Sequence, residues 1–269
     1  MEFKSILEVM VQKKASDLFV TADIPPSIKV HGRIMPVSRT RLDAAQTREL
    51  TLALMTPEQR DEFLHTKECN FAFTAKNIGR FRVSAFVQRD AVGMVLRLIE
   101  THIPTFQELG LPHSLQDLAM SNRGIVFFVG ATGTGKSTSL AAMVGYRNQN
   151  STGHIISIED PIEFLHSHAG CIVTQREVGI DTESYEVALR NTLRQAPDVI
   201  LIGEIRTREA MEHAISFAET GHLVLTTLHA NNANQALDRM LHFFPEEQHA
   251  QVLMDLSLNL RGIVAQQLV

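Results

Sequence analysis

The chain has 269 residues, of which 44% are hydrophobic and 6% aromatic, and its formal net charge at pH 7 is −5. This length suits two ordinary domains or one large one with a sizeable core. The apolar runs are much shorter than the ~20 residues that span a bilayer, so we expect no membrane span. The acidic balance and the low aromatic content argue against a nucleic-acid partner. The two cysteines are isolated and no secretory signal is present, which favours a reducing cytoplasm and predicts neither a zinc site nor a disulfide framework.

The first hundred residues predict a small domain that mixes helices with strands. Helical periodicity predicts a helix at 3–11, and N-cap and proline signals predict two more, at 43–55 and from residue 57 onward. Alternating or β-branched runs predict strands at 17–21, at 27–31, within 71–87 and at 93–99. We therefore expect an α+β domain over residues 1–100.

A linker and a second domain are expected in the rest of the chain. Residues 101–115 carry prolines and little periodicity, which favours a linker, and the second domain would cover 116–269. Runs rich in Val, Ile and Leu predict strands at 125–129, 154–158, 171–174, 198–202 and 222–226, with helices between them. Such alternation is typical of an α/β domain with a mostly parallel sheet covered on both faces.

A glycine-rich loop follows the first of these strands, and its sequence, GATGTGKS at 130–137, is a complete phosphate-binding motif. The glycines let backbone N–H groups approach a polyphosphate closely, at the point where a helix begins. Lys136 would place a charge on the β- and γ-phosphates, and the Ser137 hydroxyl would bind Mg²⁺. The motif predicts that a nucleoside triphosphate binds at Gly130, Ala131, Thr132, Gly133, Thr134, Gly135, Lys136, Ser137 and Thr138.

Carboxylates stand at the ends of two predicted strands. Glu159, Asp160 and Glu163 follow the strand at 154–158, and by spacing alone any of them could orient the water that attacks the γ-phosphate. The alternative is a solvated acidic turn. Glu204 follows the strand at 198–202, where a carboxylate commonly holds Mg²⁺ through water.

Two histidines flank the last predicted strand, His222 before it and His229 after it. Either could be an ordinary core or surface histidine. A metal site is not favoured, because no cysteine or acidic residue accompanies them at ligand spacing. The carboxyl end of the strand would let His229 sense a γ-phosphate.

The segments GATGTGKST, IEDPIEF, VILIGEIR and TGHLVLTTLH, in this order, resemble the secretion-type ATPase superfamily that powers type IV pili and type II and IV secretion. Within it the chain is similar to the pilus retraction ATPases of the PilT/PilU type. The segments TTLHANNANQALDR and LRQAPDVILIGE resemble the PilU type more than the PilT type.

The resemblance implies a PAS-like α+β N-terminal domain joined to a RecA-like P-loop ATPase domain, assembled as a hexameric ring that uses ATP and Mg²⁺. It also implies that the family's ATPase domain continues past Val269, so that its C-terminal part lies outside this sequence. Glu163 would be the general base, Glu204 would hold Mg²⁺ through water, and His222 and His229 would sense the γ-phosphate. Arginines of the N-terminal domain, Arg82 and Arg97, would act as arginine fingers. Alternation also places Arg80 on the strand face of Arg82, while a helical pair, Arg190 and Arg194, could be catalytic or form a surface ion-pair face.

The implied function is a motor whose ATP hydrolysis drives pilus retraction and twitching motility from the cytoplasmic side of the inner membrane at the pilus base. The expected partners are other copies of the chain, other retraction ATPase subunits and the pilus platform protein. The alternatives are a pilus-assembly or type II secretion motor and an accessory subunit that binds ATP with little hydrolysis. Many assembly and secretion motors carry a four-cysteine zinc insert, whereas this chain has two cysteines. A RecA-like helicase would need a basic, aromatic-bearing channel, which this composition does not favour.

Overall fold

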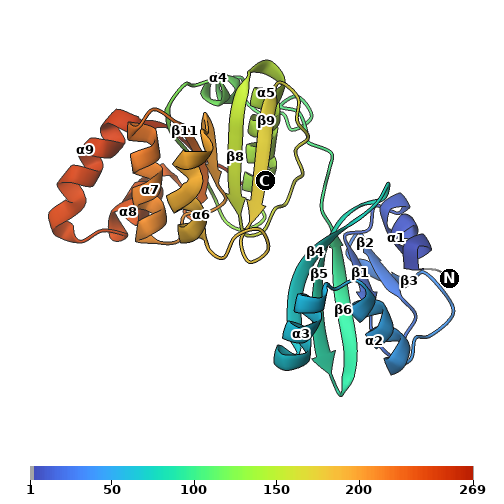
Figure 1. Ribbon diagram of the computed structural model, residues 1–269. Coiled ribbons are helices and arrows are strands. Elements are labelled where there is room, and N and C mark those ends of the chain that lie inside the picture. The colour runs from blue at the N-terminus through green and yellow to red at the C-terminus, as the bar shows by residue number, and fades with distance from the viewer. Residues whose placement is uncertain (1–2, 269) are drawn as a thin grey trace. The chain divides into compact units, whose positions relative to one another are not determined.

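The computed structural model describes residues 3–268 and divides into two compact units, Met1–Ile99 and Glu100–Val269 (Figure 1). The segment expected as a linker, 101–115, belongs to the second unit, and its Phe106 and Leu115 are buried in the core of that unit. Among the described residues, no helix is both long and apolar enough to cross a membrane.

The first unit contains an antiparallel sheet of six strands in the order β3-β2-β1-β6-β5-β4, with three helices. The strands are β1 (Asp17–Val20), β2 (Ser27–Val30), β3 (Arg33–Pro36), β4 (Glu68–Ala75), β5 (Gly79–Gln88) and β6 (Ala91–Leu98). The helices are α1 (Phe3–Gln12), α2 (Ala44–Ala53) and α3 (Pro57–Thr66). The expected α+β character of this region is confirmed.

The sequence signals for α2 and α3 correspond to hydrogen-bonded capping boxes. Asp43 caps α2 with Gln46, and Thr56 caps α3 with Gln59 in the same reciprocal way. Strand β3 was not predicted, because all of its residues are exposed and a strand without a buried face shows no alternation. Its position at the edge of the sheet is compatible with a proline at its last residue.

The second unit contains a sheet of six strands in the order β12-β7-β11-β10-β8-β9, and every neighbouring pair is parallel. The strands are β7 (Gly124–Val129), β8 (Gly153–Glu159), β9 (Cys171–Glu177), β10 (Val199–Ile202), β11 (Leu223–Leu228) and β12 (Leu260–Ala265). The five predicted strands are confirmed. Strand β12 was not predicted, since its arginine, its glycine and its partly exposed residues give no strong apolar run.

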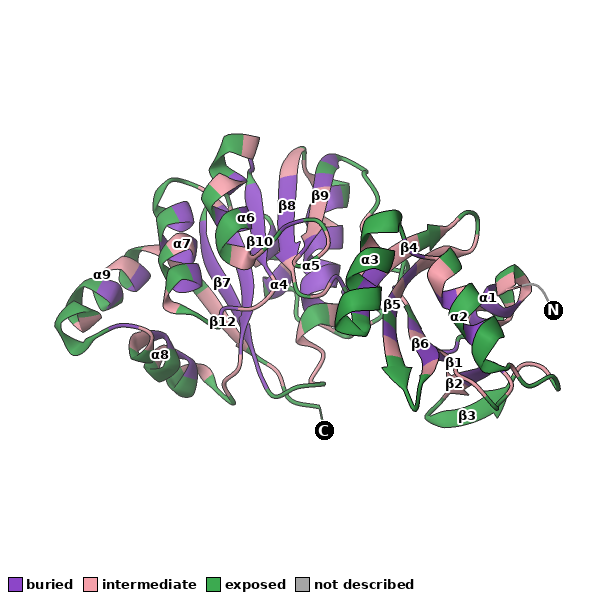
Figure 2. Cartoon of the chain, turned by 60° about the horizontal axis from the view of Figure 1, so that its bottom comes forward, coloured by how far each residue is buried: buried purple, intermediate pink, exposed green. Residues whose placement is uncertain are grey.

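Helices cover both faces of this sheet, as predicted. They are α4 (Ser114–Ala119), α5 (Lys136–Asn150), α6 (Tyr185–Thr192), α7 (Arg208–Glu219), α8 (Ala233–His242) and α9 (His249–Asn259), with 3-10 turns η1 (Leu193–Gln195) and η2 (Glu246–Gln248). Phe127 and Val224 face a core shared with α6 to α9, whereas Phe128 and Leu225 face a core shared with α4 and α5. Figure 2 shows the central strands β7, β8 and β10 as buried. Burial on both faces explains why these strands are continuously apolar.

The parallel arrangement brings four strand ends to one edge of the sheet. In the register, Val129 of β7 lies beside Leu228 of β11, and Ile202 of β10 lies beside Ile158 of β8. The segments that follow these strands therefore emerge together. They begin with the phosphate-binding loop, Asp160, Gly203 and His229.

Candidate active site

The phosphate-binding loop connects β7 to α5 through residues 130–135. Gly133 and Gly135 have φ angles of +80° and +87°, which favour glycine over other residues. A Cβ atom at Gly133 would meet no atom within 4 Å, so the space in front of this part of the loop is open. The N-terminus of α5, a helix of 15 residues, begins at Lys136. The free backbone N–H groups of such a terminus, together with the open loop, fit a phosphate group.

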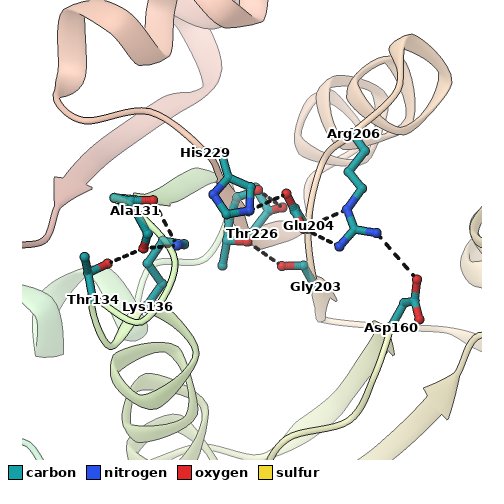
Figure 3. A network of polar contacts seen from close by, with 11 residues as sticks. Ala131, Thr134, Lys136, Asp160, Gly203, Glu204, Arg206, Thr226 and His229 are labelled. Atoms are coloured by element: carbon teal, nitrogen blue, oxygen red, sulfur yellow. Dashed lines mark hydrogen bonds and ion pairs between the residues drawn. The ribbon is translucent and has the colours of Figure 1, made fainter.

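Lys136 is held at this loop by two backbone carbonyls. Its Nζ atom donates to the Gly130 oxygen at 2.9 Å and to the Ala131 oxygen at 2.8 Å, and Thr134 Oγ1 donates to the Ala131 oxygen at 2.9 Å (Figure 3). Burial lowers the pKa of Lys136, while the nearby Glu204 carboxylate opposes that shift. The ammonium group is thus already partly desolvated beside the loop, and a phosphate oxygen can replace the carbonyls as its acceptor.

The remaining loop residues predicted to bind nucleotide, Thr132, Ser137 and Thr138, are exposed or half-buried. In the part of the chain that the structure describes, no cluster of three or more His, Cys, Asp or Glu side chains could hold a metal ion by itself. A Mg²⁺ ion at the Ser137 hydroxyl would therefore take most of its ligands from phosphate oxygens and water, as Mg²⁺ commonly does.

Glu204 is the centre of a polar network at the ends of β10 and β11. Its Oε1 atom lies 2.9 Å from Nε2 of His229, and its Oε2 atom accepts a 2.7 Å hydrogen bond from Nε of Arg206 (Figure 3). The Glu204 side chain is only 15% exposed, whereas those of His229 and Arg206 are 41% and 57% exposed. A largely buried carboxylate is thus held between two more exposed nitrogen groups.

Arg206 links this network to the acidic segment after β8, because its NH1 atom lies 3.6 Å from Oδ2 of Asp160 (Figure 3). The hydrogen bond that Arg206 donates to Glu204, followed by the charges of Glu204 and Asp160, raises the pKa of Arg206 against the effect of burial. Sequence reasoning did not single out Arg206. The residue follows Glu204 by two positions, but its pairing with Asp160 depends on the side-by-side packing of β8 and β10.

Tyr185, at the start of α6, packs against the same strand ends. A Cβ atom at Gly203 would lie 2.8 Å from the Tyr185 hydroxyl oxygen, so the tyrosine occupies the space that the glycine leaves. Burial, followed by the charges of Asp160 and Glu159, raises the pKa of Tyr185. Tyr185 was not predicted either, since nothing in the helix pattern marks it as a site residue.

The three carboxylates that sequence reasoning could not tell apart have different surroundings. Glu159 Oε1 accepts hydrogen bonds from Ser157 at 2.7 Å and from Gln175 at 3.2 Å, and burial raises the pKa of Glu159. Asp160 pairs with Arg206, as described above. Glu163 is exposed, and its side chain has no hydrogen bond or ion pair among residues 3–268. It is therefore the least constrained of the three.

The two histidines of the predicted site lie at opposite ends of β11. His229 follows the carboxyl end and contacts Glu204, whereas His222 precedes the amino end and its Nδ1 atom lies 3.0 Å from the Phe217 oxygen. At about 3.3 Å per residue, a strand of this length separates its two ends by about 20 Å. The structure brings His229 together with Glu204 and does not bring His222 to this edge of the sheet.

The predicted arginine fingers lie in the first unit, on neighbouring strands. Arg82 of β5 is directly opposite Arg97 of β6, and Arg97 is in turn opposite Asp17 of β1. Nε of Arg97 lies 2.9 Å from Oδ1 of the buried Asp17. In the second unit, exposed Arg190 pairs with Glu186 on α6 at 2.6 Å, which is an ordinary surface ion pair.

A groove of about 520 Å³ extends from the phosphate-binding loop along α8. Gly130, Ala131 and His229 line it, together with polar residues of α8 that include Asp238 and Arg239. The loop and His229, which contacts Glu204, therefore border a cavity of a size common for small-molecule ligands.

The chain is similar over nearly its whole length to known proteins of one family. The model of the type II/IV secretion system protein family matches residues 2–269. The chain is 69% identical to the type IV pilus ATPase PilU of Pseudomonas aeruginosa over 269 residues, which are 100% of this chain and 70% of that protein. It is 40% identical to the type IV pilus retraction ATPase PilT of the same organism, over 100% of this chain and 78% of that protein. The crystal structure of the pilus retraction motor PilT with bound ADP superimposes with a TM-score of 0.95 at 40% identity, covering 100% of this chain and 79% of that one.

Proposed function

Since the chain belongs to the type II/IV secretion system protein family, as a type IV pilus ATPase of the PilT/PilU type, we propose that it hydrolyses ATP to drive pilus retraction. The observation that carries this proposal is the joining, at one edge of the parallel sheet, of an open phosphate-binding loop with the Glu204–His229 pair. Bound ADP in the PilT crystal structure supports nucleotide binding at this fold.

The loop and the first turn of α5 bind the phosphates. Lys136 transfers its hydrogen bonds from the Gly130 and Ala131 carbonyls to phosphate oxygens, and the backbone N–H groups at the helix terminus add further donors. The Ser137 hydroxyl is exposed and would serve as a ligand for Mg²⁺. Bound Mg²⁺ and ATP supply the phosphoanhydride bond and a positive charge that stabilises the transition state.

Glu163 is the proposed general base that accepts a proton from the attacking water. Of the three carboxylates after β8, Glu159 is occupied by Ser157 and Gln175, and Asp160 is paired with Arg206. Glu163 keeps a free, exposed carboxylate, which is what proton acceptance requires. Its segment would have to bring it toward the phosphate loop when the nucleotide binds.

Glu204 and His229 are proposed to link nucleotide state to the position of the strand ends. Glu204 would hold Mg²⁺ through water, and His229, which lies 2.9 Å from Glu204, lines the groove beside Gly130 and Ala131. His222 is left out of this site, because it lies at the amino end of β11. Any effect of His222 on hydrolysis would have to be indirect.

The assembly proposed for this activity is a homohexameric ring. In it, the PAS-like unit and the RecA-like unit move relative to one another, and Arg82 and Arg97 provide positive charge to a nucleotide. The partners are other retraction ATPase subunits and a platform protein at the cytoplasmic side of the pilus base. The relatives named as pilus ATPases and as a retraction motor support this assignment.

The test is an ATPase assay on the purified protein, with Lys136→Ala, Glu163→Gln and the wild type compared at equal oligomeric state. We expect Lys136→Ala to lose nucleotide binding and Glu163→Gln to keep binding while hydrolysis falls about 100-fold or more, within the range for removal of a general base. Glu246→Gln, an exposed acid in η2, is the matched control. Wild-type turnover no faster than that of Glu163→Gln would refute the motor and favour an accessory subunit that binds ATP.

Pilus retraction itself is tested in cells. Twitching motility and retraction force should be lost in a strain whose only copy carries Lys136→Ala and kept with Glu246→Gln. Loss of pilus assembly, with retraction intact, would instead favour an assembly motor.

A further inference from the structure

We propose that Gln266 is a positioning residue that fastens the two ends of the phosphate-binding loop to each other. Gln266 directly follows β12, which lies beside β7 in the sheet. Gln266 thus lies beside the start of the phosphate-binding loop, at the end of the edge strand. None of the motifs recognised in the sequence includes it.

The backbone of Gln266 holds the entrance of the loop. Its N–H donates to the carbonyl oxygen of Val129, the last residue of β7, at 2.8 Å. A Cβ atom at Gly130 would lie 2.5 Å from the Gln266 backbone oxygen. The backbone segments at Gly130 and Gln266 therefore approach so closely that only glycine fits at the first position of the loop.

The side chain of Gln266 holds the exit of the loop. Its Nε2 atom donates to Oγ of Ser139, which is buried in the first turns of α5, at 2.7 Å. The Ser139 backbone N–H in turn donates to the Gly135 oxygen at 2.9 Å. One residue thus connects the end of β7 to the first turn of α5, and the span between them is the segment that surrounds a phosphate.

The carboxamide of Gln266 is not fully satisfied by the protein. Its Oε1 atom is buried and has no hydrogen-bond partner among residues 3–268. A buried acceptor without a donor is unfavourable, and an apolar side chain would avoid this cost if the position only had to fill space. A serine hydroxyl can donate or accept, so the link to Ser139 persists if the amide rotates by 180°. The amide of Gln266 therefore serves to connect β12 with α5 and does not merely fill space.

This inference rests on the proposed nucleotide binding at the loop. If Gln266 sets the width of the loop, its removal leaves the binding groups in place but lets the loop sample widths that do not match a phosphate. Nucleotide affinity should then fall, while hydrolysis at saturating ATP should change less. Simple loss of stability would not produce that split between KM and kcat.

The experiment measures ADP affinity by calorimetry and steady-state ATPase parameters on the full protein carrying Gln266→Leu or Ser139→Ala, singly and together. Each single variant should bind ADP about 3- to 10-fold more weakly, the effect of one net hydrogen bond. Because both remove the same link, the double variant should be no weaker than the more affected single variant. Gln267→Leu changes the exposed neighbour and should leave ADP affinity unchanged.

The proposal is overturned if Gln266→Leu or Ser139→Ala binds ADP as tightly as the wild type, or if their effects add fully. Ser139→Ala keeps a good helix former in α5, so it remains informative even if Gln266→Leu does not fold. Lys136→Ala distinguishes a failure of the Gln266–Ser139 linkage from a failure of nucleotide binding at the loop. If Lys136→Ala loses ADP binding while Gln266→Leu retains it, only the linkage fails, whereas retention by Lys136→Ala refutes nucleotide binding at this loop.

Discussion

Nε2 of His229 lies 2.9 Å from Oε1 of Glu204, so a histidine beside the phosphate-binding loop is held by the same carboxylate that Arg206 contacts through the other oxygen. The carboxylate thus has both oxygens engaged before any ligand binds. The position of the Glu204 carboxylate is fixed by His229, which follows β11, and by Arg206, in the loop after β10.

We expect Glu204→Gln to lower the rate of ATP hydrolysis by about 10- to 100-fold, the usual effect of losing a group that orients a metal or its ligands. ADP affinity should change little, because the phosphate loop is untouched. His229→Ala should lower the rate as well, and the double variant should be less impaired than the product of the two effects, since the residues act as a pair. Glu209→Gln, an exposed acid in the first turn of α7, is the control. Full additivity of Glu204→Gln and His229→Ala would show that they act separately.

The packing of Tyr185 over Gly203 predicts a compensating pair of substitutions. Gly203→Ala would place a Cβ atom 2.8 Å from the Tyr185 hydroxyl and should destabilise the protein by about 1–3 kcal/mol, as overpacking does. Adding Tyr185→Phe removes that oxygen and should restore part of the loss. Recovery should be incomplete, because the same Cβ atom also meets backbone atoms of Glu159 and Ile158 at 3.2 and 3.3 Å. Urea denaturation measures both effects, and no recovery in the double variant would contradict the contact.

His166 predicts a loss of stability in mild acid. Burial lowers its pKa from 6.5 to about 4, so between these values the unfolded chain binds a proton that the folded protein does not. Stability should therefore rise with pH across this window and fall on acidification. The contribution of His166 should lower the free energy of unfolding by about 2 kcal/mol between pH 7 and pH 5.

The matched variant for this prediction is His166→Gln, which carries no titrating ring. The raised pKa of Glu159 acts in the opposite direction, since its contribution is present at low pH and is lost as pH rises through its folded pKa. The difference between wild type and His166→Gln at each pH, from urea denaturation, cancels that background. Parallel stability curves for the two proteins would show that His166 is not buried in its neutral form.

The ion pair of Asp17 and Arg97 predicts a structural effect that must be separated from catalysis. Asp17 is buried, and Arg97 Nε reaches it at 2.9 Å, so Arg97→Ala leaves a buried carboxylate with one fewer donor. We expect the first unit to lose about 1–3 kcal/mol, the range for a hydrogen bond to a charged group. Asp17→Asn combined with Arg97→Ala should recover stability. If ATPase activity stays low in this stabilised double variant, Arg97 also has a role at the nucleotide.

The phosphate-binding loop could be predicted because its strand, turn and helix are consecutive in the sequence. The network around Glu204 could not, since Asp160, Arg206 and Tyr185 come from segments that meet only when β8, β10 and α6 pack together. The placement of His222 depends on the length of β11, whose two ends lie at opposite edges of the sheet. The pairing of Arg82 with Arg97 depends on the hairpin register of β5 and β6, which alternation alone does not specify.

Strand β12 was missed for a related reason, because half-exposed edge strands carry a weak apolar signal. Its absence from the prediction also hid Gln266. The residues that sequence reasoning found are those whose chemistry is local. The residues that it missed, Arg206, Tyr185 and Gln266, contact and position site residues that are distant from them in the sequence.

The hydrogen bond between Gln266 and Ser139 joins residues 127 positions apart, and that between Arg261 and Arg123 joins residues 138 positions apart. During translation, the phosphate-binding loop therefore emerges from the ribosome long before strand β12 is synthesised. Contacts of such large sequence separation form late in folding. During synthesis, the nascent chain should reach its full affinity for nucleotide only after residue 266 has left the exit tunnel, so an increase in nucleotide affinity would report that β12 has joined the sheet beside β7.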